Sequence, residues 1–170
     1  MEKSLLMVAD RLGVVNHAVG VAGRNIAGAF LVFMTVIVMA QVIFRYGLNN
    51  SLAWTEELSK TLMVWTAFLV APWAYREKAN VAIELFSDAL HPRIRAAGQI
   101  IITLLIIWIV SIFLRESVDF VMRGMQSRSA SLPISTGYFY LIVPVSFAAL
   151  LIAAIEQFLR DVVALRAKPE

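Results

Sequence analysis

An arginine, a tryptophan and a pair of carboxylates stand close together between two long apolar runs of this sequence. Arg45 follows the first run, and Trp54, Glu56 and Glu57 come just before the second. A carboxylate at a membrane boundary could carry a proton or a cation, and an arginine there could bind an anionic substrate. Because charges at the edge of a hydrocarbon layer need partners, the stretch predicts either a transport site or a structural interface.

Spacing favours the structural interpretation. Glu56 and Glu57 are adjacent, so on a helix they point about 100° apart and cannot both face one site. Glu56 and Lys60 are four residues apart, the spacing of a stabilising ion pair along a helix. We therefore predict a structural ion-pair network or a subunit interface, with no catalytic residue. Its members are Arg45, Trp54, Glu56, Glu57, Lys60, Trp65 and Arg76.

Other chemistries are excluded by the scarcity of ligating side chains. The chain has no cysteine, which rules out disulfides, thiol redox chemistry and thiolate metal sites. His17 and His91 both lie outside the apolar runs, so they cannot hold a haem inside a helix bundle. Neither a cofactor, a bound metal nor an enzymatic activity is expected.

Composition indicates an integral membrane protein. Of the 170 residues, 60% are hydrophobic and only 16% are charged, and the mean hydropathy is +0.77. The formal charge of +3 does not indicate nucleic-acid binding, because the basic residues flank apolar runs, where they orient a protein in the membrane. The expected fold class is all-α, with membrane lipid around it.

Four transmembrane helices are predicted from the apolar runs. The uncharged run between Arg24 and Arg45 has 20 residues, enough to cross the roughly 30 Å core of a bilayer. The second run, 61–75, is short, so its helix is expected to begin near Ser51 and to include the two glutamates. Pro144 is expected to kink the last helix. The predicted spans are about 24–45, 52–75, 96–115 and 136–156.

Two further helices are expected to lie along the membrane surface, at about 4–19 and 80–91. Each carries apolar residues at helical spacing on one face. No Gly/Pro/Ser-rich linker and no repeat divides the sequence. The chain is therefore predicted to be a single domain, 1–170.

The distribution of Lys and Arg predicts the orientation. Ten of them lie at the two ends of the chain and between the second and third spans, against five in the other two loops. By the positive-inside rule, both termini are expected in the cytoplasm. The loop at Arg45 and the loop at 115–128 are then outside.

A series of features follows in a fixed order through most of the chain. They are Phe44-Arg45-Tyr46 at the end of the first span, Ser51, Trp54-Thr55-Glu56-Glu57, Trp65, Phe68-Leu69, Arg76, Leu132-Pro133-Ile134, Tyr140 and Pro144. Together with the size and the four spans, this combination resembles the small membrane subunit, DctQ type, of tripartite ATP-independent periplasmic (TRAP) transporters.

The resemblance implies a non-catalytic scaffold of the bacterial inner membrane that binds and stabilises a large DctM-type subunit, one to one. That large subunit would hold the substrate and sodium sites for sodium-coupled uptake of an organic acid of the dicarboxylate or sialic acid class. A periplasmic binding protein would deliver the substrate. Arg123 and Arg128, in the second outer loop, are the candidate docking residues for that protein.

Two other functions stay open on the residues alone. A self-sufficient small homodimeric transporter would use a membrane-boundary carboxylate, Glu56 or Glu57, and a membrane assembly factor would have no transport role. Few polar side chains fall within the predicted spans, which leaves little to coordinate an ion or a solute. This scarcity favours a scaffold.

Overall fold

The computed structural model describes residues 2–50, 52–87, 92–129, 131 and 133–166, and within these ranges the protein is helical, without a strand. Four helices are long and one is a single turn. They are α1 (Glu2–Gly47), α2 (Ala53–Ser87), α3 (Pro92–Met125), α4 (Gly137–Tyr140) and α5 (Ile142–Arg166). The all-α class predicted from the sequence is confirmed for this part of the chain.

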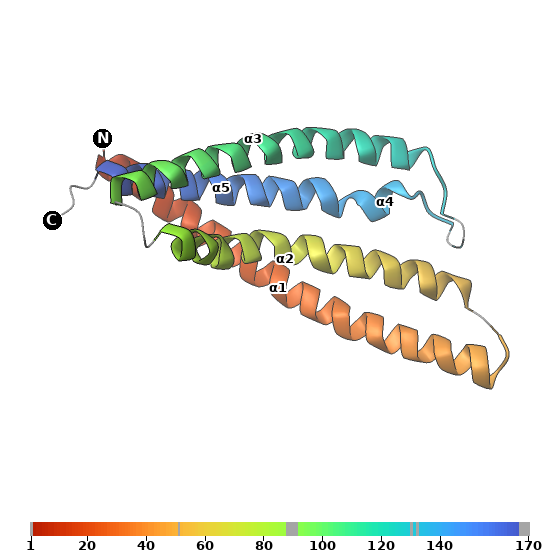
Figure 1. The fold of residues 1–170 in the computed structure, drawn as a ribbon. Coiled ribbons are helices and arrows are strands. Elements are labelled where there is room, and N and C mark those ends of the chain that lie inside the picture. Colours follow the sequence, from red (N-terminus) through yellow and green to blue (C-terminus); the bar gives the residue numbers. More distant parts are fainter. Residues whose placement is uncertain (1, 51, 88–91, 130, 132, 167–170) are drawn as a thin grey trace.

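The long helices form two antiparallel pairs that lie side by side. Helix α1 packs on α2, α3 packs on α5, and α5 also contacts both α1 and α2 (Figure 1). The two chain termini lie at one end of the bundle, and the α1–α2 and α3–α4 connections lie at the other (Figure 1). We call these the terminal end and the loop end.

Among the described residues, three helical segments are long and apolar enough to cross a membrane: Ala9–Gly47 in α1, Ala97–Met125 in α3, and Gly137–Val163 in α4 and α5. The described part of α2, which contains the second predicted span, is not apolar enough over a sufficient length to be counted with these three segments. The reason is its composition, because only 15 residues, 61–75, separate Lys60 from Arg76. The protein is thus a membrane protein with three clearly apolar helices.

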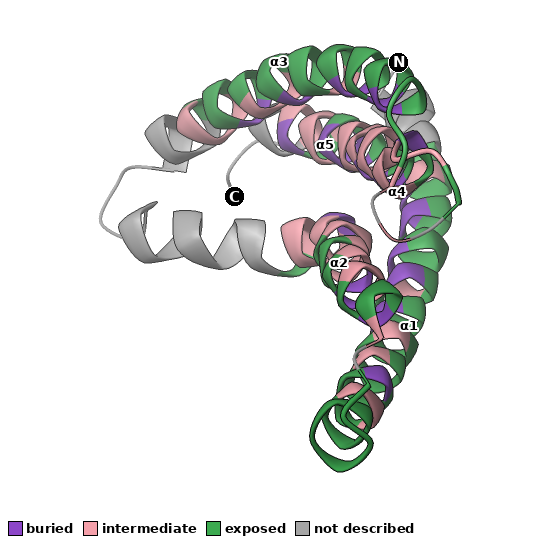
Figure 2. Cartoon of the chain, turned by 90° about the vertical axis from the view of Figure 1, so that its right-hand side faces the viewer, coloured by how far each residue is buried: buried purple, intermediate pink, exposed green. Residues whose placement is uncertain are grey.

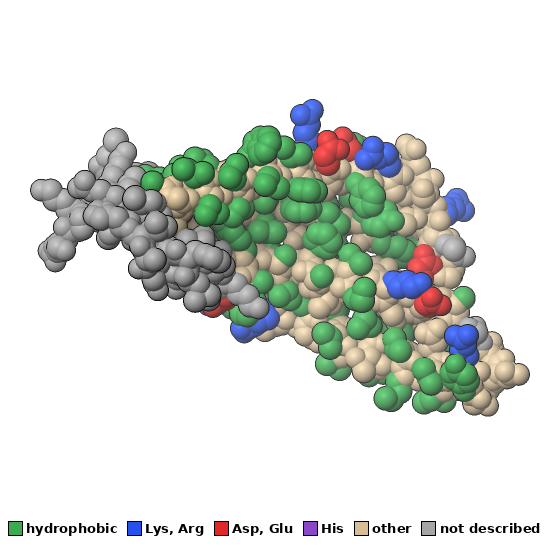
Figure 3. Space-filling view, viewed as in Figure 1, with side chains coloured by type: hydrophobic (Ala, Val, Ile, Leu, Met, Phe, Trp, Pro, Cys, Tyr) green, Lys and Arg blue, Asp and Glu red, His purple; other side chains and the backbone are tan. Residues whose placement is uncertain are grey.

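Much of the apolar surface is exposed in the single chain. Figure 2 shows exposed residues along the outer sides of α1 and α3, and all of 42–47, the last residues of α1, are exposed. Hydrophobic side chains cover much of the face in Figure 3. Such a surface is stable in contact with lipid or with another membrane subunit.

Helix α1 is longer than the two segments predicted within it. An interfacial helix at 4–19 and a span at 24–45 were expected, and the structure joins both in one helix of 46 residues. Gly20 and Gly23 lie at the expected break, but they serve close packing instead. A Cβ atom on Gly23 would stand 2.6 Å from the Leu69 carbonyl oxygen of α2.

Helix α2 likewise continues past the end of its predicted span. A separate interfacial helix at 80–91 was expected, whereas the helix from Ala53 runs on without a break to Ser87. Residues 88–91 lie outside the part of the chain that the structure describes. Residues 76–80 contain no proline, and even Pro72, which lies inside α2 and cannot donate a backbone hydrogen bond, does not end the helix.

The kink expected at Pro144 stays a prediction, because Leu141, the one residue between α4 and α5, keeps helical backbone angles (φ −57°, ψ −28°). Helix α4 ends at Tyr140 and α5 begins at Ile142. Proline lacks an N–H group, so it cannot donate to the carbonyl of the residue four positions earlier, here Tyr140. The missing hydrogen bond therefore lies at the boundary between α4 and α5.

Aromatic rings connect the two helix pairs. The ring centroid of Phe147 in α5 lies 5.5 Å from that of Phe113 in α3 and 6.0 Å from that of Phe68 in α2. Phe30 of α1 and Trp65 of α2 lie 6.1 Å apart. Close approach elsewhere depends on small residues, since Ala9, Ala27, Ala153 and Ala154 are all buried.

Candidate functional site

Glu57 connects the start of α2 to the loop between α3 and α4. Its carboxylate accepts hydrogen bonds from the Ser129 hydroxyl at 2.5 Å and from the Ser131 backbone N–H at 3.1 Å. The Ser131 hydroxyl also donates to it. Hydrogen bonds to a carboxylate are stronger than bonds between neutral groups. Glu57 is therefore a tie between two segments more than seventy residues apart in sequence.

The neighbouring Glu56 is placed quite differently. It pairs with Lys60 at 2.7 Å, as the spacing of the two residues predicts, and both side chains are largely exposed. An ion pair of this kind contributes only a few tenths of a kcal/mol. As expected for adjacent helical residues, the two glutamates face different surroundings.

The other aromatic and basic residues singled out at the loop end have mixed roles. Trp65 donates its indole N–H to the Phe139 carbonyl at 2.8 Å, which ties α2 to α4. Trp54 is exposed, and the exposed Arg45 guanidinium lies over the ring of its neighbour Tyr46. Arg45 is thus placed as a membrane-end anchor on α1.

Arg76 lies at the opposite end of the molecule from Glu57. The two residues are 19 positions apart on α2, about 28 Å along a helix and close to the thickness of a bilayer core. The structure therefore divides the predicted set into two groups. Glu57 and Trp65 make contacts near the loop end, and Arg76 makes its contact at the terminal end.

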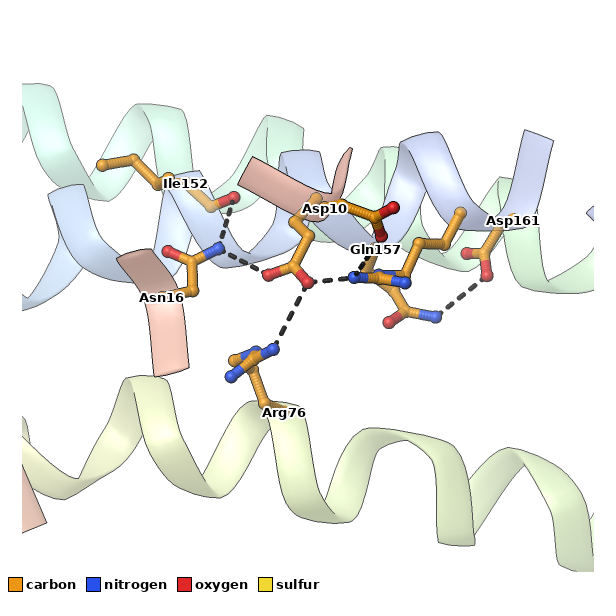
Figure 4. Close-up of polar contacts among 8 residues, drawn as sticks. Asp10, Asn16, Arg76, Ile152, Gln157 and Asp161 are labelled. Carbon is orange, nitrogen blue, oxygen red and sulfur yellow. Dashed lines mark hydrogen bonds and ion pairs between the residues drawn. The ribbon is translucent and has the colours of Figure 1, made fainter. Parts of the chain in front are cut away.

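Glu156 is the partner of Arg76, and it joins three helices (Figure 4). Its buried carboxylate accepts from Arg76 of α2 at 3.3 Å, from Asn16 of α1 at 2.6 Å and from Arg160 of α5 at 3.1 Å. Arg160 also pairs with Asp10 of α1 at 3.6 Å. Two cations, Arg76 and Arg160, therefore face this buried carboxylate, and a buried charge with such partners costs less than an unpaired one.

A second buried carboxylate, Asp161, connects α3 to α5. It accepts hydrogen bonds from the Thr103 hydroxyl and from the Gln157 side-chain amide, both at 2.9 Å (Figure 4 shows the second). Both donors are neutral. Asp161 and Glu156 together tie α5 to each of the other long helices at the terminal end.

A polar cavity of about 370 Å³ lies beside the Glu156 group. His17, Arg76, Glu77 and Arg160 are among its lining residues. A second cavity, of about 240 Å³, lies at the loop end and includes Glu57 and Lys60 in its wall. Among the described residues, no three His, Cys, Asp or Glu side chains are grouped so that they could hold a metal ion.

The two candidate docking residues are both at the loop end. Arg123 is in the last turn of α3, Arg128 is in the α3–α4 loop, and both side chains are exposed. The sequence did not predict the partners of the central carboxylates: Asn16, Arg160, Ser129 and Ser131. The spacing of Glu156 and Arg160 is the one local signal that was available, since they are four residues apart.

These features define a class of protein: a helical membrane protein whose polar side chains mostly tie its own helices together. The comparison with family models then places it more narrowly. Residues 34–164 match the model of the DctQ component of tripartite ATP-independent periplasmic transporters. The chain belongs to this family, as its sequence features predicted, and the family is one of transporters and not of catalytic enzymes.

Three named relatives share this family relationship. A Haemophilus influenzae protein named as a TRAP transporter small permease is 33% identical over 76 residues, 45% of this chain and 47% of that protein. The isethionate TRAP transporter permease protein DctMQ of Oleidesulfovibrio alaskensis is 23% identical over 71% of this chain and 20% of its own length. The sialic acid TRAP transporter permease protein SiaT of Haemophilus influenzae is 29% identical over 64% of this chain and 17% of its own length.

The chain therefore spans about half the length of the small permease it matches and a fifth or less of the two longer proteins. No solved structure matches the chain.

Proposed function

We propose that this chain is the small membrane subunit of a TRAP transporter, a scaffold that binds and stabilises a large DctM-type subunit in 1:1 ratio. The observation that carries the proposal is the match to the protein named DctMQ. The matched part is most of this chain but only a fifth of that relative. A DctQ-like segment that forms part of one long permease supports a one-to-one association when the two parts are separate chains.

The surface of the chain supports the same role. Large apolar side chains are exposed along α1 and α3, for example Val32 and Met39 at 65% and Trp108 at 63%. A large membrane partner would cover part of this surface, and lipid the rest. The buried carboxylates Glu156 and Asp161 bond to neighbouring helices, so they hold the scaffold together and are not used for transport.

For the membrane arrangement we propose four spans with both termini in the cytoplasm of a bacterial inner membrane. Helix α2 is the fourth span, because it lies between the apolar helices α1 and α5 and contacts both. Its two polar clusters, at Glu57 and at Arg76, are then about one bilayer core apart. The surplus of Lys and Arg at the terminal end supports the cytoplasmic side for that end.

The proposed transport activity belongs to the assembled complex. Substrate and sodium would bind the large subunit, and a periplasmic binding protein would deliver an organic acid. Two of the three named relatives are permeases for isethionate and sialic acid, which supports an organic acid as the substrate. Arg123 and Arg128 would lie on the periplasmic side, where the binding protein docks.

Affinity purification of the tagged chain from its native operon, in mild detergent, tests the proposal. Mass spectrometry is expected to find one large multi-span protein in equimolar amount. Recovery of the chain alone as a homodimer would contradict the scaffold and favour a self-sufficient transporter. An untagged strain controls for nonspecific recovery.

A further inference from the structure

Backbone hydrogen bonds connect the described residues on the two sides of the α3–α4 loop, 127–129 and 133–136. The Ser129 N–H donates to the Ile134 carbonyl and the Thr136 N–H to the Ser127 carbonyl, both at 3.0 Å. These bonds pair the two sides of the loop around Arg128, which forms an isolated antiparallel bridge with Ser135. The backbone that carries the Arg128 side chain is therefore fixed on both sides.

Packing holds the base of this loop. A Cβ atom on Gly124 would stand 2.8 Å from the Tyr140 ring and 3.0 Å from the Gly137 Cα atom, so α3 and α4 approach closely there. The rings of Phe120 and Tyr140 lie 4.3 Å apart beside this contact. The loop thus emerges from a tightly packed pair of helix ends.

Glu57 ties the described part of this loop to α2. Its carboxylate accepts hydrogen bonds from Ser129 and Ser131, which follow shortly after Arg128. The carboxylate is only partly exposed, while the Arg128 side chain is exposed. The Glu57 carboxylate therefore makes contacts within the molecule, whereas the Arg128 side chain is exposed at the surface.

We propose that Glu57 is a positioning residue that holds the α3–α4 loop so that Arg128 meets a carboxylate-bearing face of the substrate-binding protein. The inference rests on the function proposed above. It adds that docking depends on α2 through the Glu57 carboxylate. A loop backbone that is already held in place loses less conformational entropy on binding than a mobile one. An acidic partner face is also attracted by the exposed Arg123 nearby.

The test uses the complete transporter in proteoliposomes, with uptake measured against the concentration of substrate-loaded binding protein. Glu57→Ala is expected to raise the half-saturating concentration of binding protein about tenfold, which corresponds to about 1.4 kcal/mol. The maximal rate and the yield of the two-subunit complex are expected to stay unchanged. Glu56→Ala is the matched control, because it removes the adjacent carboxylate, which pairs with the exposed Lys60.

A double-mutant cycle separates positioning from a general structural role. Arg128→Ala is expected to raise the half-saturating concentration, and Glu57→Ala added to it is expected to cause little further change. The same tenfold effect of Glu57→Ala in both backgrounds would overturn the proposal, as would no effect of Glu57→Ala at all.

Two further variants keep the test decisive if Glu57→Ala folds poorly. The double variant Ser129→Ala/Ser131→Ala removes the two hydroxyl donors of the loop and leaves α2 intact. It is expected to raise the half-saturating concentration of binding protein, with a normal yield of the two-subunit complex. A normal half-saturating concentration in that variant and in Arg128→Ala would overturn the proposal. Failure of the wild-type chain to recover the large subunit would instead refute the proposed function.

Discussion

At the scale of single residues, Glu156 is the side chain on which the terminal end of the bundle depends most. It is 4% exposed and accepts hydrogen bonds from α1, α2 and α5. Gly13 allows this convergence, because a Cβ atom there would stand 2.8 Å from both Glu156 Oε1 and Arg160 Nη2. A larger residue at position 13 would force the ends of these two side chains to shift.

Glu156→Ala is expected to lower the free energy of unfolding by about 2 kcal/mol. Removing one partner of a buried ion pair costs about 3 to 5 kcal/mol, but Arg76 is 28% exposed and keeps some solvation, and Arg160 is 44% exposed and keeps its ion pair with Asp10. Thermal unfolding of the purified chain in detergent measures the change. Glu77→Ala, at an exposed position of the same end, serves as control, and equal losses in both variants would contradict this role for Glu156.

Sequence reasoning found the charged residues but only part of their pairing. The Glu56 and Lys60 pair follows from helical spacing alone, and the structure contains it. Arg76 was grouped with the loop-end residues, whereas it bonds to Glu156, 80 positions later in the sequence. Glu156 itself ends an apolar run, where a charge simply marks the end of a span. Only the packing of α1, α2 and α5 shows that it has three partners.

At the scale of helices, α1 and α2 make close contact through glycine. Gly20 faces the Cβ atom of Trp73, and Gly23 faces the Leu69 carbonyl. Small residues at a membrane helix contact let the backbones approach and so increase the van der Waals attraction between them. Arg24, the residue after Gly23, also contacts α2: its guanidinium lies over the Trp73 ring, 5.4 Å from the ring centroid.

Gly23→Ala is expected to destabilise the α1–α2 pair by about 1 to 3 kcal/mol, because its new methyl group would clash with backbone and not with a flexible side chain. Gly28→Ala, five residues along the same helix, meets no atom within 4 Å and is expected to be neutral or to stabilise by up to about 1 kcal/mol. Thermal unfolding of both variants in the same detergent compares them. A loss of stability in Gly28→Ala as large as in Gly23→Ala would refute the packing argument.

The helices themselves follow from the apolar runs, but their ends do not. The first three predicted spans each lie almost wholly within one helix of the structure, and the fourth covers α4 and the first part of α5. The breaks expected after residue 19 and after residue 75 are absent. Polar composition there indicated a surface position, yet both helices continue through these positions. Where a helix leaves the membrane and where it ends are separate questions.

At the scale of the whole molecule, the chain has two polar ends and an apolar middle with little internal chemistry. Its buried carboxylates join helices, and its large exposed apolar surface is suited to contact with lipid or with another membrane subunit. Membership of the DctQ family gives this arrangement its context. The account therefore predicts a subunit that is required for transport and has no transport activity alone.

Reconstitution tests that claim most directly. Proteoliposomes are prepared with this chain, with the large subunit, or with both, and uptake of a radiolabelled organic acid is measured with the binding protein outside and an inward sodium gradient. The account predicts sodium-dependent uptake only when both membrane subunits are present. Uptake by this chain alone, abolished by Glu56→Ala or Glu57→Ala, would contradict it and identify a self-sufficient transporter.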